Sequence, residues 1–513
     1  MAVKTFAAID VGSFELSMKI YEASSKNGMK QIDHIRRSID LGTETYNVGK
    51  LCFERVEELC QTLKEFHDIM DSYGVKEYKA YGTSAIREAK NTTILLDQVK
   101  QRTGIDIGVL SNSEQRFLDY KSIAFQGKKF DRFIEQGACI LDVGGAGIQI
   151  SCFDNKKLVS TQGMKLGVLR IQDRMNTLKV SLGNYSKFVT ELCESALNTY
   201  KKLYIKENTI DNLIIFDDHI SMLVNRSDDI VAGDMFTLET VEKYLDMASS
   251  KNRYDVAKEL AVATEELPLI YISLLLLHQV MLTMGASRVW APGSSLCDGI
   301  AYEYAEKNGL VSTVHDFDED IRSCALQISK RYNGSRKRAE TIEGIALAIF
   351  DEVSKTHGLT ARDRLLLQIS AILHDCGKYI SMANLAECSY SIIKNTEIIG
   401  ISHKERIMVA NIVKYNQTIF DYYEDFEDYN EISRPDHMRI AKLTAILRVA
   451  NGLDRSHKMK FKNVKAEIEK DRLILNVETN EDITLEKGLF TNRADFFEEV
   501  YNLVPVIKQK RSI

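Results

Sequence analysis

One pattern occurs twice in this chain of 513 residues: an apolar strand, a glycine-containing turn with an aspartate, and a second strand. The first copy, FAAIDVGSFELSMKIYE, runs from Phe6 to Glu22, and the second, ACILDVGGAGIQISCF, from Ala138 to Phe153. An apolar run followed by a turn and an alternating run is typical of a β-hairpin. The repeat predicts two duplicated α/β lobes that face each other across a cleft and contribute one glycine tip each.

The two tips have the composition of an anion site. Glycine lets backbone N–H groups approach a phosphate closely, and Asp10 and Asp142 end the first strand of each copy, a position suited to binding Mg²⁺ or orienting water. A single Asp-x-Gly sequence is also common in ordinary type I′ or II′ hairpin turns. Because both copies have one, we expect Gly12 and Gly145 to enclose one anion from opposite sides.

Composition narrows the class of protein. The chain is 44% hydrophobic and 27% charged with only 4 prolines, which predicts a protein folded nearly throughout. A net charge of −6 supplies no basic field for nucleic acid, so we expect no nucleic-acid partner.

Nine cysteines without paired CxxC spacing, and a start that lacks the pattern of a signal peptide, predict a cytoplasmic protein with reduced cysteines. The apolar stretch from Leu267 to Met284 carries several polar residues, which favours a buried helix over a membrane span.

The chain changes character near Asp316. Helical periodicity dominates from there, and a short β-hairpin is expected from Val464 to Val477. We therefore predict four domains: a first lobe over residues 1–125, a second lobe over 126–310, a mainly helical domain over 315–460 and a small α/β domain over 461–513.

At the level of motifs, the chain resembles the exopolyphosphatase/guanosine pentaphosphatase (Ppx/GppA) family. The resemblance rests on IDVGSFELSM, YGTSAIREAKN, LSNSEQRFLDY, LDVGGAGIQIS, MKLGVLR and PGSSLCDGIAYE, which occur in the order of the family. It implies the actin-like ASKHA fold, made of two ribonuclease H-like lobes with a cleft. It also implies Mg²⁺-dependent hydrolysis of terminal phosphates of inorganic polyphosphate or pppGpp, by an acidic cluster between the lobes.

The resemblance implies a role for individual residues. It assigns phosphate binding to Asp10, Gly12, Ser13, Thr83, Arg87, Gly144, Gly145 and Gly147, and Mg²⁺ to Asp10 and Asp142. Phe14 replaces an asparagine of the family's first loop, which removes one polar ligand.

The expected catalytic positions are Glu114, Gln115, Asp142 and Gln149, and two of them depart from the family pattern. Gln115 stands where the family has the glutamate that acts as general base, and Gln149 replaces a second acidic residue. An amide orients water but does not take its proton, so the usual gain of roughly 10²- to 10⁴-fold from a general base is at risk. We expect the loss of these two charges to make the pocket less repulsive to a polyanion. A one-residue alignment error, or replacement of the base by Glu114, remains open.

The helical domain resembles a degenerate HD domain through LLLQISAILHDCGK and AILRVANGLDRSH. His374 and Asp375 form an intact His-Asp pair, but the positions that match further metal ligands are Arg338, Cys388, Asn416 and Asn451. We therefore expect a structural pair without a metal. The domain would serve as a scaffold, a dimer surface or part of a polyanion groove, and we expect a homodimer.

Several basic residues are candidates to line such a groove, although charge runs are usually solvated faces. They are Lys156, Lys157, Lys165, Arg170, Lys201, Lys202, Arg336, Lys337 and Arg338.

The leading functional prediction is a phosphohydrolase of reduced activity. The alternative is a regulator that binds polyphosphate or a guanosine penta- or tetraphosphate without hydrolysing it, which the two Gln exchanges favour. A third option, a sugar or acetate kinase of the same superfamily, needs an adenosine pocket. DNLIIFDDHISML lacks the glycine-rich run expected of one.

Overall fold

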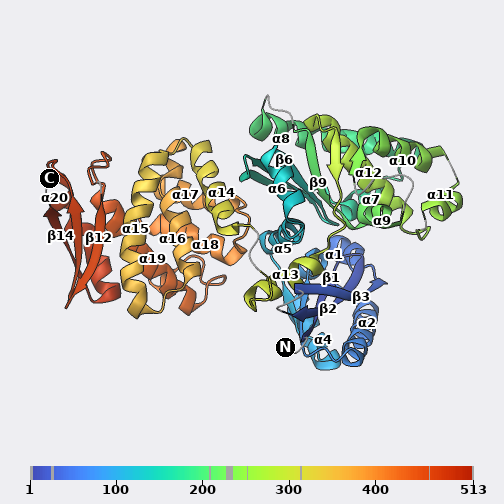
Figure 1. The fold of residues 1–513 in the computed structure, drawn as a ribbon, viewed down its shortest axis with the longest axis horizontal. Helices are drawn as coiled ribbons and strands as arrows, with labels where there is room; N and C mark the ends of the chain where they lie inside the picture. Colours follow the sequence, from blue (N-terminus) through green and yellow to red (C-terminus); the bar gives the residue numbers. More distant parts are fainter. Residues whose placement is uncertain are drawn as a thin grey trace. The chain divides into compact units, whose positions relative to one another are not determined.

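The computed structural model describes residues 4–24, 28–206, 210–226, 235–250, 252–260, 262–311, 315–461 and 463–510. It divides into two compact units, Met1–Asp316 and Phe317–Ile513 (Figure 1). The finer division into four domains stays a prediction.

The first lobe of the N-terminal unit is built on a five-stranded sheet in the order β3-β2-β1-β4-β5. Its strands are β1 (Lys4–Val11), β2 (Glu15–Ser24), β3 (Gly28–Ser38), β4 (Glu77–Gly82) and β5 (Ile107–Val109). β1 pairs with β2 in an antiparallel manner and with β4 in a parallel manner, so the first repeat is the hairpin that the sequence predicted.

Helices cover both faces of this sheet. On one face α2 and α4 lie side by side, with Leu63 and Val99 packed into the same core as Ile9. On the other face α5 and α13 (Leu296–Lys307) pack against Phe6 and Tyr21. The helices that follow the strands of this lobe are α1 (Gly42–Val48), α2 (Phe53–Ser72), α3 (Ser84–Glu88), α4 (Thr92–Thr103) and α5 (Asn112–Ala124).

The second lobe is built on a six-stranded sheet in the order β10-β11-β9-β6-β7-β8. Its strands are β6 (Ala138–Val143), β7 (Ile148–Asp154), β8 (Lys157–Met164), β9 (Asn212–Phe216), β10 (Met235–Thr237) and β11 (Arg288–Trp290). All residues of β6 are buried, as is typical of a central strand whose faces are covered, and this explains the apolar run that precedes Asp142. The second repeat is therefore also a hairpin, at the centre of its sheet.

The helices of the second lobe enclose a single apolar core with this sheet. They are α6 (Lys128–Glu135), α7 (Val168–Thr177), α8 (Tyr185–Tyr200), α9 (Asp218–Arg226), α10 (Leu238–Ser250), α11 (Arg253–Leu260) and α12 (Leu267–Met284). Among the described residues α12 is the one helix long and apolar enough to cross a membrane, but 67% of it is buried inside the protein. Such burial is typical of a core helix.

The chain passes between the lobes twice. The first passage lies between α5 and α6, and the second, after β11, leads into α13 (Leu296–Lys307), which returns to the sheet of the first lobe. The two passages touch each other, since the Gln126 side chain donates a hydrogen bond to Ser294 Oγ at 3.4 Å. The predicted second lobe, 126–310, therefore includes a helix that packs on the first lobe.

One pair of cysteines departs from the sequence-based expectation. Cys139 on β6 lies directly opposite Cys152 on β7, and the two form a disulfide, whereas the other seven cysteines are free. The expectation of reduced cysteines is thus wrong for this pair. The reason is the register of the hairpin, which brings together two residues that no short spacing motif connects.

The C-terminal unit begins with a helical array and ends in a three-stranded sheet in the order β12-β13-β14. The β12/β13 hairpin, Val464–Glu469 with Arg472–Glu478, lies where the sequence predicted one, and β14 (Val504–Lys510) adds in parallel to β13. The helices are α14 (Phe317–Arg331), α15 (Arg336–His357), α16 (Ala361–Leu373), α17 (Leu385–Asn395), α18 (His403–Tyr415), α19 (Arg434–Leu453) and α20 (Thr484–Tyr501).

Candidate active site between two glycine tips

The first glycine tip joins β1 to β2 in a turn that excludes larger residues. The Gly12 N–H donates to the Glu15 carbonyl at 3.0 Å, and a Cβ on Gly12 would lie 2.6 Å from that oxygen. Ser13 is held by hydrogen bonds of 2.9 Å to Tyr46 Oη and 2.8 Å to Ser84 Oγ. The turn therefore has a fixed shape, as a preformed phosphate loop requires.

The second tip joins β6 to β7 and packs against the start of α7. Gly144 donates to the Gly147 carbonyl at 3.0 Å, and the Arg170 N–H donates to the Gly145 carbonyl at 3.2 Å. A Cβ on Gly145 would lie 3.4 Å from Ser13 Cβ. The tips of the two lobes are thus neighbours, as the repeat predicted.

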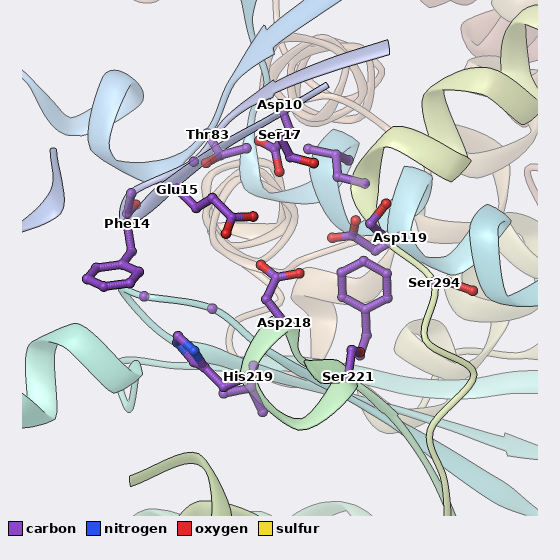
Figure 2. Close-up of a pocket in the computed structure, with 18 of the residues that line it drawn as sticks. Asp10, Phe14, Glu15, Ser17, Thr83, Asp119, Asp218, His219, Ser221 and Ser294 are labelled. Atoms are coloured by element: carbon purple, nitrogen blue, oxygen red, sulfur yellow. The ribbon is translucent and has the colours of Figure 1, made fainter. Parts of the chain in front are cut away.

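Both tips line one cavity of about 390 Å³. Figure 2 shows the carboxylates of Asp10, Glu15, Asp119 and Asp218 around a common space. Eight of the residues singled out from sequence line this cavity: Asp10, Gly12, Ser13, Thr83, Gln115, Asp142, Gly144 and Gly145.

Arg87 and Glu114 are not among the residues that line the cavity. Each is bound to a structural partner. The Arg87 guanidinium donates to the Leu110 carbonyl at 2.6 Å and to Asn112 at 2.5 Å. Glu114 accepts from the Ser111 N–H at 2.9 Å in the capping box that starts α5. Phosphate binding by Arg87 stays a prediction, and it would require the guanidinium to leave these partners.

Gln149 and Gly147 also lie outside the lining. The Gln149 carbonyl oxygen accepts from Arg116 Nη1 at 2.8 Å, and Arg116 Nε forms an ion pair with Asp142 at 3.8 Å. A Cβ on Gly147 would lie 2.6 Å from the Met164 carbonyl, so this glycine permits close packing of β7 against the end of β8. Arg116, which sequence reasoning missed, supplies positive charge beside Asp142.

The cavity is strongly acidic although Gln115 and Gln149 carry no charge. Three further carboxylates, those of Glu15, Asp119 and Asp218, line it. Burial raises the pKa of Glu15 to about 7 although Arg36 binds it at 2.7 Å. The sequence held a signal for each of the three. Glu15 adjoins Phe14, Asp119 follows Gln115 by one helical turn, and Asp218 lies in the segment DNLIIFDDHISML, which lacks glycines.

Several carboxyl oxygens at the cavity are buried and accept no hydrogen bond from the described residues. Among them are Oδ1 of Asp10 and both oxygens of Asp119. Burial, followed by the charges of Asp218 and Glu15, raises the pKa of Asp10 well above its usual value. Burial and the charges of Asp142, Asp10 and Asp218 do the same for Asp119. Buried carboxylates without partners are costly and mark candidate functional groups.

The cations that line the cavity are already engaged. Lys19 binds Asp298 at 2.7 Å, and Arg36 binds Glu15. None of the basic residues proposed for a polyanion groove is among the lining residues. Arg170, for example, donates to the Ala146 carbonyl at 3.0 Å. Positive charge for a phosphorylated ligand therefore has to come from a bound cation or from rearrangement of these pairs.

In the C-terminal unit, Arg338 binds the His374–Asp375 pair. The Arg338 guanidinium, whose side chain is 7% exposed, donates to His374 Nε2 at 2.6 Å, to Asp375 at 3.0 Å and to Asp454 at 3.2 Å. It also donates to the Asn451 carbonyl oxygen at 2.9 Å. No group of three or more His, Cys, Asp or Glu residues able to hold a metal occurs in the described part of the chain.

Comparisons with known proteins extend over both units. Residues 20–308 match the model of the Ppx/GppA phosphatase family, and residues 321–494 match that of Ppx/GppA phosphatase domain III. The chain is 22% identical over 451 residues to a guanosine-5′-triphosphate,3′-diphosphate pyrophosphatase of Pseudoalteromonas translucida, covering 86% of each chain. It is 20% identical to the protein of the same name from Photobacterium profundum, covering 80% of each.

A solved structure shows the same fold. The crystal structure of an exopolyphosphatase-like protein is 16% identical with a TM-score of 0.50, and the match covers 60% of this chain and 99% of that one. The two lobes are therefore actin-like ASKHA lobes, and a mainly helical C-terminal unit with a small α/β end follows them, as predicted. With both glycine tips in place and the family model matched over 289 residues (20–308), the chain belongs to the Ppx/GppA phosphatase family.

Proposed function

We propose that this protein is a phosphohydrolase that removes terminal phosphates from inorganic polyphosphate or pppGpp. The observation that carries the proposal is the convergence of both glycine tips, with Asp10 and Asp142, on one cavity. The names of the relatives support it, since they include guanosine-5′-triphosphate,3′-diphosphate pyrophosphatases and an exopolyphosphatase-like protein.

The acidic cavity calls for a divalent cation when a polyanion binds. Oxygen ligands from one or two carboxylates, completed by phosphate oxygens, suit Mg²⁺. Asp10 and Asp142 fit this role, because both end strands at the cavity and Asp10 Oδ1 is a buried oxygen that accepts no hydrogen bond from the described residues. When bound, Mg²⁺ would neutralise charge on the phosphate oxygens.

The chain itself supplies positioning. Gly12, Ser13, Thr83, Gly144 and Gly145 line the cavity, so backbone N–H groups at the two tips and the hydroxyl groups of Ser13 and Thr83 are candidates to orient the terminal phosphate. Water then attacks the terminal phosphorus, the anhydride P–O bond breaks, and the bond electrons remain on the oxygen of the shortened chain. Gln115 can align that water but not take its proton, which supports a slow reaction.

A regulator that binds the same ligands without turnover is the second candidate. The contact of Arg116 with Asp142 and Gln149 favours it, because a guanidinium beside Asp142 competes with a metal ion. A slow enzyme and a regulator differ in phosphate release but not in binding.

The test measures both quantities on the full-length chain. Phosphate release from long-chain polyphosphate and from pppGpp would be followed with Mg²⁺ and with EDTA, beside calorimetric binding of each compound. Hydrolysis of either compound that needs Mg²⁺ and is lost in Asp142→Asn supports the enzyme. Tight binding with no release would leave the regulator, and absence of both would refute the two proposals together.

A further inference from the structure

A carboxylate occurs one helical turn beyond the position where the resemblance expects the general base. Gln115 and Asp119 are four residues apart on α5, so they lie on the same face of the helix. Both line the cavity between the glycine tips. Position 115 lacks a carboxylate, but Asp119 supplies one from the same face of α5.

The surroundings of Asp119 leave its carboxylate without a structural role. The residue is 2% exposed, and neither of its oxygens accepts a hydrogen bond from the described residues. Structural carboxylates are normally bonded when buried, because an isolated charge in the interior is strongly unfavourable. Figure 2 shows Asp119 on the opposite side of the common space from Glu15, with Asp10 and Asp218 between them.

Several other carboxylates near the cavity are committed to other contacts. Glu114 caps α5, Glu15 binds Arg36, and Asp142 lies in an ion pair with Arg116. Asp298 accepts hydrogen bonds from Lys19 and from the Ser295 N–H. Asp119 is the buried carboxylate of α5 that no such contact occupies.

We propose that Asp119 replaces the missing glutamate as the group that accepts the proton of the attacking water, while the Gln115 amide orients that water. The inference rests on the proposed function. In the step, the water oxygen forms a bond to the terminal phosphorus, its proton passes to a carboxylate oxygen of Asp119, and the bridging P–O bond breaks. The bond electrons leave with the shortened chain, and the protonated Asp119 later returns its proton to solvent.

A relocated base requires a different position for the attacking water. Asp119 lies one turn, about 5–6 Å, along the helix from Gln115, and its side chain is one methylene shorter than that of glutamate, so the water would have to lie nearer to Asp119 than to the family position.

The experiment exchanges the base between the two positions. Asp119→Asn, Gln115→Glu and the double variant would be compared with the wild-type chain in the phosphate-release assay, with folding checked by thermal melting. Asp119→Asn is expected to lower kcat by roughly 10²- to 10⁴-fold. Adding Gln115→Glu to it is expected to restore at least about tenfold, because this change returns a carboxylate to the family position.

The matched control is Asp106→Asn, which removes an exposed aspartate paired with Lys100 and is expected to leave kcat unchanged. A wild-type rate in Asp119→Asn, or no gain from Gln115→Glu in its background, would overturn the assignment of the base while leaving the proposed function intact. No hydrolysis by the wild-type chain would overturn both.

Discussion

The two charged clusters of this protein differ in whether their buried polar groups have hydrogen-bond partners. In the N-terminal unit, five carboxylates line one cavity, and buried oxygens of Asp10 and Asp119 accept no hydrogen bond from the described residues. In the C-terminal unit, the buried groups around His374 and Asp375 converge on Arg338 and are satisfied by it. A cluster that is left incomplete fits a ligand site, whereas one completed from within the chain contributes to the fold.

The largest effect is expected from removing the central cation of the C-terminal cluster. Arg338→Ala leaves the buried Asp454 without its paired guanidinium and leaves Asp375 with Lys378 as its remaining cation, and we expect a loss of about 3–5 kcal/mol in unfolding free energy. Urea unfolding followed by far-UV circular dichroism measures it. Arg336→Ala, on the same helix but 76% exposed, is the control and is expected to change stability by less than about 0.5 kcal/mol. Equal effects of the two changes would show that the cluster adds no stability.

The next largest effect is expected from Mg²⁺, which should stabilise the N-terminal unit and leave the stability of the C-terminal unit unchanged. Binding at Asp10 and Asp142 would stabilise the N-terminal unit by about 2.7 kcal/mol at a hundredfold excess over Kd. The single tryptophan, Trp290, is buried in this unit, so its fluorescence reports unfolding there alone. The expected shift should vanish in Asp142→Asn. A shift of the same size in hydrogen exchange of α15 and α19 would contradict a site confined to the cavity.

A smaller effect of opposite sign is expected from Asp119→Asn. At pH 8 this change replaces a buried, unpartnered carboxylate by an amide of the same shape, and we expect a gain of about 1 kcal/mol in the stability of the N-terminal unit. Urea unfolding followed by Trp290 fluorescence measures it, with Asp106→Asn as the reference. A loss of stability would mean that Asp119 has a partner that holds the fold together.

The last prediction is a difference in pH dependence between the two units. Burial raises the pKa of Glu15 from 4.5 to about 7, so the folded N-terminal unit binds the extra proton and its stability falls as pH rises between these values. Burial lowers the pKa of His374 from 6.5 to about 4, so there the unfolded chain binds the extra proton and stability falls as pH decreases from 6.5 towards 4.

Moving from pH 7 to pH 5.5 should therefore stabilise the unit that contains Trp290 relative to the C-terminal unit. Urea midpoints from Trp290 fluorescence and from hydrogen exchange of the C-terminal helices would show the two trends. Midpoints that shift together would remove the distinction between the clusters.

Local motifs made the glycine tips predictable, because Asp-x-Gly turns between apolar strands depend on neighbouring residues alone. The placement of Asp10 and Asp142 at one cavity followed from the repeat. Roles of individual residues at the site, the Mg²⁺ ion, the homodimer and the cytoplasmic location stay predictions.

What sequence could not provide depends on helix phase and on contacts between distant segments. Asp119 faces the cavity only because of the direction in which α5 crosses it, and Arg338 completes a cluster with residues more than a hundred positions away. The Cys139–Cys152 disulfide depends on hairpin register. Each of these needs a three-dimensional arrangement that periodicity does not encode.

The double passage of the chain between the lobes limits how the cavity can open. A single linker would leave the lobes free to rotate in any direction, whereas two adjacent passages, joined through Gln126 and Ser294, restrict the relative rotation of the two lobes and so hold the two glycine tips in register.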